Sequence, residues 1–334
     1  MTAQSIGDLA QAFLLRRQSV EAKQSLGDQA RALTTGRVAD PGARLKGDYG
    51  TLTVLERRIT ISESYRLAGA EAATLARGQQ AALGAVAEAT RELAIGLIEH
   101  ASGTPAQNPL RGTEAEAAFA SVVSSLNTSA GGRSLFAGVA SDGPALAPAQ
   151  AMLTGIRAAV AGLTEPGDVV AAVEAWFDDP AGGFATTGYL GGDTPLSPIL
   201  VDEGEQLQLS TRADDPALKA LLAALALGTI AGDPNVTLSD PARAAVFRSA
   251  GDRMLAAQDG IIALRAGVGQ VEARIEKAAT RLSAESAAAE VARAELVGVD
   301  RFEAATRLKD AERRLELVYE VTARLSRFSL LDRL

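Results

Sequence analysis

The chain has 334 residues, a formal net charge of −8 and no cysteine. Hydrophobic residues make up 47% of it and aromatic residues only 4%, and such an aromatic-poor, alanine-rich composition favours long helices packed side by side over a wide α/β core. The negative charge argues against nucleic acid as the main partner, because nucleic-acid binding depends on basic surfaces. The absence of cysteine excludes disulfides, thiolate metal sites and cysteine nucleophiles.

Catalytic and metal chemistry have few candidate residues. His100 is the only histidine, so we expect no catalytic residues, no metal and no cofactor; His100 itself is interpreted as a solvated or helix-capping residue. No apolar run approaches the ~18 residues of a membrane helix, so no membrane partner is expected. Residues 1–23 show no cleavable secretory signal, which on its own suggests a cytoplasmic protein.

The first helix is predicted over residues 5–33. Its apolar and small residues alternate steps of four and three, the spacing of a coiled-coil seam. The members of this seam are Leu15, Ser19, Ala22, Leu26, Gln29 and Leu33. Residues 34–37 interrupt the pattern, and Asp40-Pro41-Gly42 ends it.

A very long helix is predicted next, over residues 43–102, which would span ~90 Å at ~1.5 Å per residue. Gly103-Thr104-Pro105 ends it, and a shorter helix follows over residues 112–128. The glycines at 131, 132 and 138 flank a short apolar run, which indicates a tight hairpin or extended turn.

Residues 148–233 differ in character and predict a compact α+β insert. Short helices (Ala149–Leu163 and Asp168–Phe177) alternate with Pro/Gly-rich segments. Ile199–Val201 and Gln206–Ser210 flank the turn Asp202–Glu205, a pattern that predicts a β-hairpin. Residues 218–227 are apolar except for Lys219 and predict a buried helix.

Residues 241–297 resume the long helical pattern, and Gly298-Val299-Asp300 interrupts it. The last segment, residues 300–334, carries two apolar rows, more than an isolated helix leaves exposed. The first row is a coiled-coil seam of Leu308, Ala311, Leu315, Val318, Thr322 and Leu325. The second row is Leu317, Val321, Phe328 and Leu331. This helix therefore needs more than one partner.

The order of these segments predicts a mainly α fold in which long antiparallel helices form a hairpin-like arrangement with a small α+β insert. Because ends pair with ends, the two chain termini should lie together. The expected parts are a terminal coiled-coil domain (1–40 and 300–334), a helical rod domain (41–147 and 241–299, with a β-hairpin near 131–147) and the insert domain (148–240).

The candidate functional residues are those that would contact neighbouring copies of the chain. They come from both terminal helices: Leu15, Leu26, Leu33, Leu308, Leu315, Val318, Leu325, Phe328 and Leu331. The acidic pairs at 178–179, 202–203 and 214–215 are interpreted as loop and cap residues, because no ligand set surrounds them.

Several motifs together resemble the flagellin superfamily. They are the boundary Leu33–Pro41, the segment Gly132–Gly138 (GRSLFAG), Arg265–Arg274 (RAGVGQVEAR) and the terminal coiled-coil segment. Leu126–Gly138, and Tyr189–Asp193 followed by the turn at Asp202–Gly204, more closely resemble the flagellin-like hook-associated proteins, the hook-associated protein 3 family. The resemblance covers essentially the whole chain, although the usual start of these families is missing.

The resemblance implies a non-enzymatic structural subunit of the bacterial flagellum, an adaptor at the hook–filament junction. Such proteins are exported unfolded through the flagellar type III channel, so the expected localisation becomes extracellular. The implied partners are further copies in a ring, the neighbouring hook-associated protein and flagellin, with an export chaperone on the C-terminal helix as a further candidate. A short flagellin is the nearest alternative, and a secreted enzyme on a helical stalk is the alternative from another class.

Overall fold

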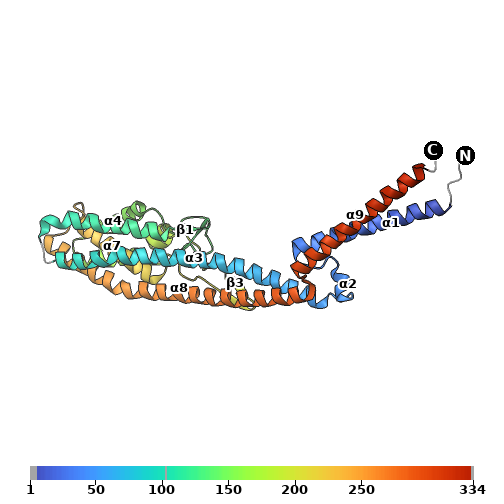
Figure 1. Cartoon of the computed structure of the whole chain (residues 1–334). Helices are drawn as coiled ribbons and strands as arrows, with labels where there is room; N and C mark the ends of the chain where they lie inside the picture. The colour runs from blue at the N-terminus through green and yellow to red at the C-terminus, as the bar shows by residue number, and fades with distance from the viewer. Residues whose placement is uncertain (1–5, 102–103, 332–334) are drawn as a thin grey trace. The chain divides into compact units, whose positions relative to one another are not determined.

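The computed structural model describes residues 6–101 and 104–331, with the side chains of residues 6–9, 11–12 and 325–331 left out of the description. Helices dominate it, and its strands form two small antiparallel sheets (Figure 1). The prediction of a mainly α fold with long helices and a small β content is confirmed. Within the described residues, no helix combines the length and hydropathy that crossing a membrane requires.

The chain divides into two compact units. Unit 1 comprises residues 1–63 and 283–334, and unit 2 comprises residues 64–282. Two long helices contribute to both units: α3 (Gly50–His100) and α8 (Asp240–Val297). The three-part domain division expected from the sequence stays a prediction.

In unit 2, α3 and α8 run antiparallel and are joined by side-chain amides. Gln258 Nε2 donates to Thr90 Oγ1 at 2.8 Å, and Gln80 Nε2 lies 3.4 Å from the carbonyl oxygen of Arg265. Two further helices pack against each other beside them, α4 (Asn108–Leu126) and α7 (Pro216–Gly232). A short 3₁₀ turn, η1 (Pro105–Gln107), precedes α4.

The helix α7 forms the centre of the core of unit 2. All its residues from Leu221 to Gly232 are buried, as the apolar sequence predicts. It begins at Asp215, whose carboxylate accepts a hydrogen bond from the amide of Ala217. Because α7 has no polar side to show to solvent, it is stable only when other helices surround it.

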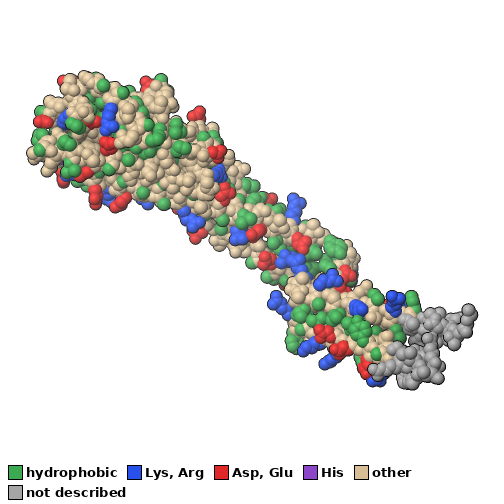
Figure 2. All heavy atoms as spheres, turned by 90° about the horizontal axis from the view of Figure 1, so that it is seen from above, with side chains coloured by type: hydrophobic (Ala, Val, Ile, Leu, Met, Phe, Trp, Pro, Cys, Tyr) green, Lys and Arg blue, Asp and Glu red, His purple; other side chains and the backbone are tan. Residues whose placement is uncertain are grey.

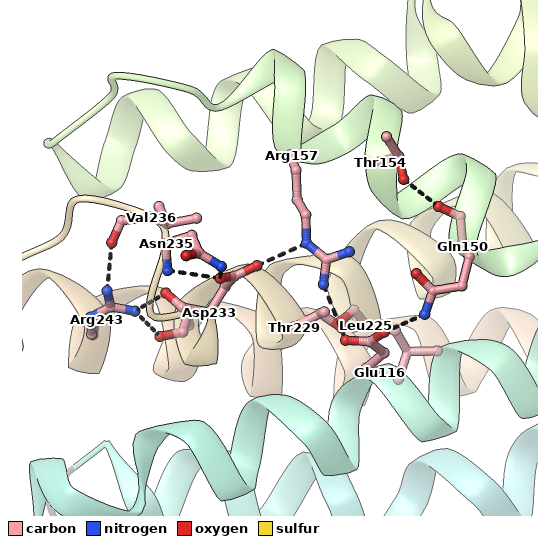
Figure 3. Close-up of polar contacts among 11 residues, drawn as sticks. Glu116, Gln150, Thr154, Arg157, Leu225, Thr229, Asp233, Asn235, Val236 and Arg243 are labelled. Carbon is pink, nitrogen blue, oxygen red and sulfur yellow. Dashed lines mark hydrogen bonds and ion pairs between the residues drawn. The ribbon is translucent and has the colours of Figure 1, made fainter.

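The carboxyl end of α7 is held by two arginines (Figure 3). Arg243 on α8 donates to the carbonyl oxygens of Ala231 and Asp233, both at 2.8 Å. Arg157, on α5 (Ala149–Ala159), pairs with the carboxylates of Asp233 at 2.8 Å and Glu116 at 3.1 Å. Arg243 thereby satisfies carbonyl groups that a helix end leaves without partners, and Arg157 holds the carboxylate of Asp233 beside them.

An aromatic cluster completes the insert. It lies between α6 (Pro166–Asp178), a π-helical turn at Phe184–Gly188 labelled η2, and the residue that follows. The rings of Trp176 and Phe177 meet edge to face with centroids 4.8 Å apart, and Phe184 stacks on Tyr189 at 6.2 Å. These ring contacts hold together short helices that have no long seam to pack along.

Two hairpins are present, one at Ser129–Ser134, just before the predicted 131–147, and one at the predicted turn Asp202–Glu205. β1 (Ser129–Ala130) pairs with β2 (Arg133–Ser134), and the two glycines between them have the positive φ values that such a tight turn needs. β3 (Ile199–Asp202) pairs with β4 (Glu205–Leu207) around Gly204. Gln79 of α3 connects the two regions, because its buried amide donates to the carbonyls of Leu135 and Thr211.

The helix boundary that differs most from the sequence-based expectation is the start of the long helix α3. The long helix predicted from residue 43 begins instead at Gly50, after a short helix α2 (Pro41–Leu45). Lys46 and Gly47 adopt left-handed φ values of 52° and 84°, which end α2. The left-handed pair is the physical reason for the break, and Pro41 at the first turn of α2 favours the separate start.

Unit 1 contains α1 (Ile6–Thr35) and α9 (Arg301–Leu331), which lie side by side and antiparallel (Figure 1). The first residues of α1 and the last residues of α9 therefore meet at one end of the pair. At the other end, the segment that follows α1 and the segment that precedes α9 lie side by side and are joined by backbone hydrogen bonds. The amide of Val38 donates to the carbonyl of Val297 at 2.8 Å, and that of Val299 to the carbonyl of Gly36 at 3.0 Å.

Candidate assembly surface

The α1–α9 pair is built on the heptad spacing seen in the sequence. On α9, Ala304 and Ala311 are buried against α1, and Leu308, Leu315 and Val318 of the same row are half-buried. The α1 seam residues, Leu15, Ser19, Ala22, Leu26, Gln29 and Leu33, are half-buried as well. Two helices alone can only half-cover their shared seam.

The structure therefore places six of the nine candidate residues at a contact within the chain. They are Leu15, Leu26, Leu33, Leu308, Leu315 and Val318. The side chains of the other three, Leu325, Phe328 and Leu331, lie outside the described residues. Whether any of the nine contacts a neighbouring copy stays a prediction.

Other apolar side chains of the pair are exposed. Leu317 and Val321, the second row predicted on the last helix, are exposed, Leu317 to 59%. On α1, Phe13 is 69% exposed, and Leu14 and Val20 are also exposed. The sequence-based site list contains none of these exposed residues, although the seven-residue step from Phe13 to Val20 is a usable signal on α1. These exposed residues are the side chains free to contact another chain.

Charged residues surround these apolar positions. In Figure 2, hydrophobic, basic and acidic side chains alternate over the visible surface of the pair. Several of the charges form exposed pairs one helical turn apart, such as Arg17–Glu21 at 2.8 Å and Arg307–Glu303 at 2.6 Å. Exposed pairs of this kind contribute little to stability, because solvent screens them. The charges thus affect solubility and orientation more than stability.

A cation–π contact and a shallow hollow lie on one side of the pair. The Lys23 ammonium lies 5.7 Å from the centroid of the Tyr319 ring. Lys23, Gln24, Gly27, Asp28 and Arg31 line a shallow hollow on α1, and no atom lies within 4 Å of the position that a Cβ on Gly27 would take. A side chain from another helix can enter such a hollow, which is the geometry of coiled-coil contacts.

The junction between the helices of unit 1 depends on glycine. Gly36 has a φ of +67°. At Gly298, a Cβ would lie 2.2 Å from the carbonyl oxygen of Ala294, so no larger residue fits there without movement. The paired breaks keep α1 and α9 aligned with each other at the point where each helix starts or ends.

The residues considered for chemistry have structural roles. His100 is the last residue of α3, as its helix-end interpretation requires, but the expectation that it is solvated is wrong. It is buried, with Nε2 2.8 Å from Asn108 Oδ1 and its ring edge-on to Phe247. The burial arises because α8 packs over the end of α3 there.

The acidic pairs are loop and cap residues, as predicted. Asp179 and Asp215 cap backbone amides, and Asp214 pairs with Arg212. Asp202 pairs with Arg281 of α8, which binds the β3–β4 turn to that helix. In the described part of the chain, no group of three or more metal-ligating side chains comes together.

Among the acidic groups of unit 2, the carboxyl of Asp233 and the phenol of Tyr189 have shifted pKa values. Burial alone would raise the pKa of Asp233, but hydrogen bonds from Asn235 and Arg157 outweigh it and lower the pKa below the ordinary value of 3.8. Burial, followed by the negative charge of Asp214, raises the pKa of Tyr189 to about 12. Neither group lies in a cleft with other reactive side chains, so both shifts reflect packing.

Comparison with known proteins bears on the terminal helices. Residues 255–334 match the family model of the bacterial flagellin C-terminal helical region. This segment contains most of the α8 helix and all of α9. The resemblance to flagellins noted in the sequence is thus confirmed over this segment.

The search of curated proteins gives no match. Among solved structures, one similar chain is described as a flagellar hook-associated protein from Vibrio parahaemolyticus. It is 19% identical, with a TM-score of 0.46, and the match covers 77% of this chain and 95% of that one. The last 80 residues are thus similar to the C-terminal helical region of bacterial flagellins.

Proposed function

We propose that this protein is a structural subunit of the bacterial flagellum, an adaptor at the hook–filament junction. The observation that carries the proposal is the α1–α9 pair. Its last helix lies in the segment that matches flagellins, and its seam is only half-covered within one chain. Its exposed apolar residues, including Leu317 and Phe13, are available to be buried against another subunit.

In this proposal the protein leaves the cell unfolded through the flagellar type III channel and acts outside it. The terminal helices then pack with those of neighbouring copies in a ring, so that apolar burial is completed only on assembly. The hook-associated protein on one side of the ring and flagellin on the other are its further partners. An export chaperone would cover the last helix before export.

A truncation tests the role of the last helix. A chain that lacks Arg324–Leu334 should remain a soluble, folded monomer, because the core of unit 2 lies elsewhere. It should no longer be found in flagella isolated from cells that make no other copy. Circular dichroism and sedimentation provide the folding control, and normal incorporation of the truncated chain would disprove the proposed assembly role.

A short flagellin is the second candidate, because the matched family is flagellin itself. Immunogold labelling of isolated flagella separates the two functions. A label confined to the boundary between hook and filament supports the junction adaptor, whereas a label along the filament supports flagellin. Hydrolase activity in the full chain that depends on residues 148–233 would instead revive the enzyme alternative.

A further inference from the structure

The β3–β4 hairpin is bound to α8, and its turn carries only negative charge (Figure 1). Asp202, Glu203 and Glu205 supply that charge. No lysine or arginine occurs between Arg157 and Arg212, so the turn finds no cation within its own segment of the chain. Its counter-charges come from another element.

That element is α8, which supplies two arginines about two helical turns apart. Arg281 donates from Nε to Asp202 Oδ2 at 2.6 Å and from Nη2 to Glu205 Oε2 at 2.9 Å. It thereby joins the end of β3 to the start of β4. Arg274 Nη2 lies 3.3 Å from the other carboxylate oxygen of Glu205. Because they share this carboxylate, the four side chains form one network, here called the clasp.

The clasp is partly open to solvent, so dissolved ions can reach it. The side chains of Arg281 and Glu205 are 40% and 27% exposed, whereas that of Asp202 is only 13% exposed. Ion pairs at such positions weaken as salt rises, because the screening length falls from ~10 Å at ~0.1 M to ~3 Å at ~1 M. The clasp is therefore the salt-sensitive part of the contact between hairpin and helix.

The hairpin adds only two buried side chains to the core. Within residues 199–207, Val201 and Leu207 are buried and the others are exposed or half-buried. The two belong to the same buried cluster as Leu75 of α3 and Ile275 of α8. By contrast, α7 is buried along most of its length. The hairpin is thus far less firmly held than the centre of unit 2.

The hydrogen-bonded ladder of the hairpin is short. Three pairs of residues join β3 to β4, with an irregularity between Leu200 and Asp202. The two strands form a sheet of their own, and a two-stranded hairpin is only marginally stable by itself. Pro198, directly before β3, has no N–H with which to extend the ladder. The hairpin therefore depends on its contacts with the helices to stay in place.

The base of the hairpin, in contrast, is fixed. Gln208 Nε2 donates to the carbonyl of Leu196 at 3.2 Å and ties the two ends of the hairpin together. Leu196 and Leu209 are buried there. Just beyond, the carbonyl of Thr211 accepts a hydrogen bond from Gln79 of α3. A hairpin with a fixed base and a weakly held body can move as one piece.

We propose that the β3–β4 hairpin is a salt-sensitive strap. The clasp closes it over α3 and α8, and screening of the clasp lets it open while the rest of unit 2 stays folded. Opening uncovers Val201 and Leu207 together with the part of the core that contains Ile275. Access to these apolar side chains then depends on the ionic strength of the surroundings. The strap is a property of unit 2 and does not rest on the proposed flagellar function.

A single thiol can report the opening, because the natural chain contains no cysteine. In the full chain with Val201→Cys, the thiol is covered while the strap is closed and reacts with the uncharged reagent dithiodipyridine when it opens. Val122→Cys, at a buried position of α4, is the matched reporter for the core. We expect Val201→Cys to react at least roughly tenfold faster than Val122→Cys. Raising the salt from ~0.1 M to ~1 M should increase the rate severalfold for Val201→Cys alone.

Variants of the clasp test the cause of the opening. With Arg281→Gln, the Val201→Cys thiol should react faster already at low salt, and added salt should have little further effect. Lys277→Gln removes the same charge from an exposed lysine of α8 between the two clasp arginines and should leave the rate unchanged. Glu203→Gln, at the exposed turn, is the matched control on the hairpin.

Equal rates for the two reporters at every salt concentration would overturn the proposal. So would a fast Val201→Cys reaction that responds neither to salt nor to Arg281→Gln, because the clasp would then not hold the hairpin. If Val201→Cys changes the circular dichroism spectrum, hydrogen exchange of the wild-type chain takes its place. The amides of β3 and β4 should exchange severalfold faster at high salt while those of α7 stay protected, and unchanged exchange in the hairpin would refute the strap.

Discussion

Gly112 of α4 and Gly232 of α7 lie directly against each other where the two helices cross. A Cβ on Gly112 would lie 2.6 Å from the Cα of Gly232, and a Cβ on Gly232 would lie 2.3 Å from the Cα of Gly112. The atoms in the way are backbone atoms, which cannot turn aside as a side chain can. The crossing of α4 and the buried helix α7 therefore depends on both glycines.

This contact predicts that Gly112→Ala and Gly232→Ala each lower the free energy of unfolding, by ~1–3 kcal/mol as is usual for overpacked cores. Urea unfolding followed by circular dichroism measures the change. The matched control is Gly267→Ala in α8, where a Cβ meets no atom within 4 Å. That variant should be more stable by ~1 kcal/mol, because alanine favours helix over glycine. Equal effects at both sites would contradict the close approach.

The pair of Arg157 and Asp233 predicts acid sensitivity. The pKa of Asp233 is lower in the folded chain than the value of 3.8 expected unfolded, so its contribution to stability is present above pH ~4. It is lost as the pH falls through the folded pKa. Asp233→Asn should lower the free energy of unfolding at pH 7 by ~1–3 kcal/mol, since Arg157 loses a charged partner.

The same substitution should make stability less dependent on pH below 4. Unfolding curves of wild type and Asp233→Asn at several pH values between 2 and 7 check this expectation, and they should converge at the acid end. A constant difference between the two curves would show that the carboxylate does not titrate as the structure implies.

Tyr189 predicts a loss of stability in alkali. Its pKa is raised from 10.0 to about 12 in the folded chain. Stability is therefore complete below pH ~10 and falls as the pH rises toward 12, because only the unfolded phenol ionises in that range. Absorbance at the phenolate band should show one tyrosine that titrates late, and the late step should be missing in Tyr189→Phe. The hydroxyl also donates to the carbonyl of Gly192 at 3.0 Å, so the variant should be slightly less stable at pH 7.

The seam of the terminal pair can be opened without touching unit 2. Ala311→Glu places a charge at a buried position of α9 that faces α1. Hydrogen exchange should then quicken in α1 and α9 while the amides of α7 stay protected. Arg313→Glu, at an exposed position of the same helix, is the control and should leave exchange unchanged. Equal protection of α1 in both variants would mean that the seam does not hold the pair.

The helices and their order could be predicted because their signals are local. Heptad spacing predicts α1, α8 and α9, and an apolar run predicts α7. Glycines between short apolar or polar segments predict the turns of the two hairpins. The start of α3 could not be predicted as well, because the left-handed turn at Lys46 has no strong local signal. The burial of His100 depends on Phe247, which is 147 positions away in the sequence, and periodicity says nothing about such contacts.

The candidate site shows a similar limit. Apolar rows identified the right helices, but they could not say which row the chain uses within itself. The structure assigns the row that contains Leu308 and Leu315 to the internal seam and leaves Leu317 and Val321 exposed. On α1, the polar residues Ser19 and Gln29 weaken the coiled-coil pattern. Phe13 and Val20 lie outside that pattern, so the heptad spacing does not identify them.

The packing of α4 on α7 also has a consequence for the order in which the chain folds. These helices are separated by a modest stretch of sequence, whereas α1 and α9 come from opposite ends of the chain, and closing so long a loop costs more entropy. Contacts between α3 and α8, such as that of Thr90 with Gln258, become near neighbours only after α7 has returned to α4. Folding should therefore begin at the middle of the sequence and proceed outward, so that the two terminal helices are the last to pair.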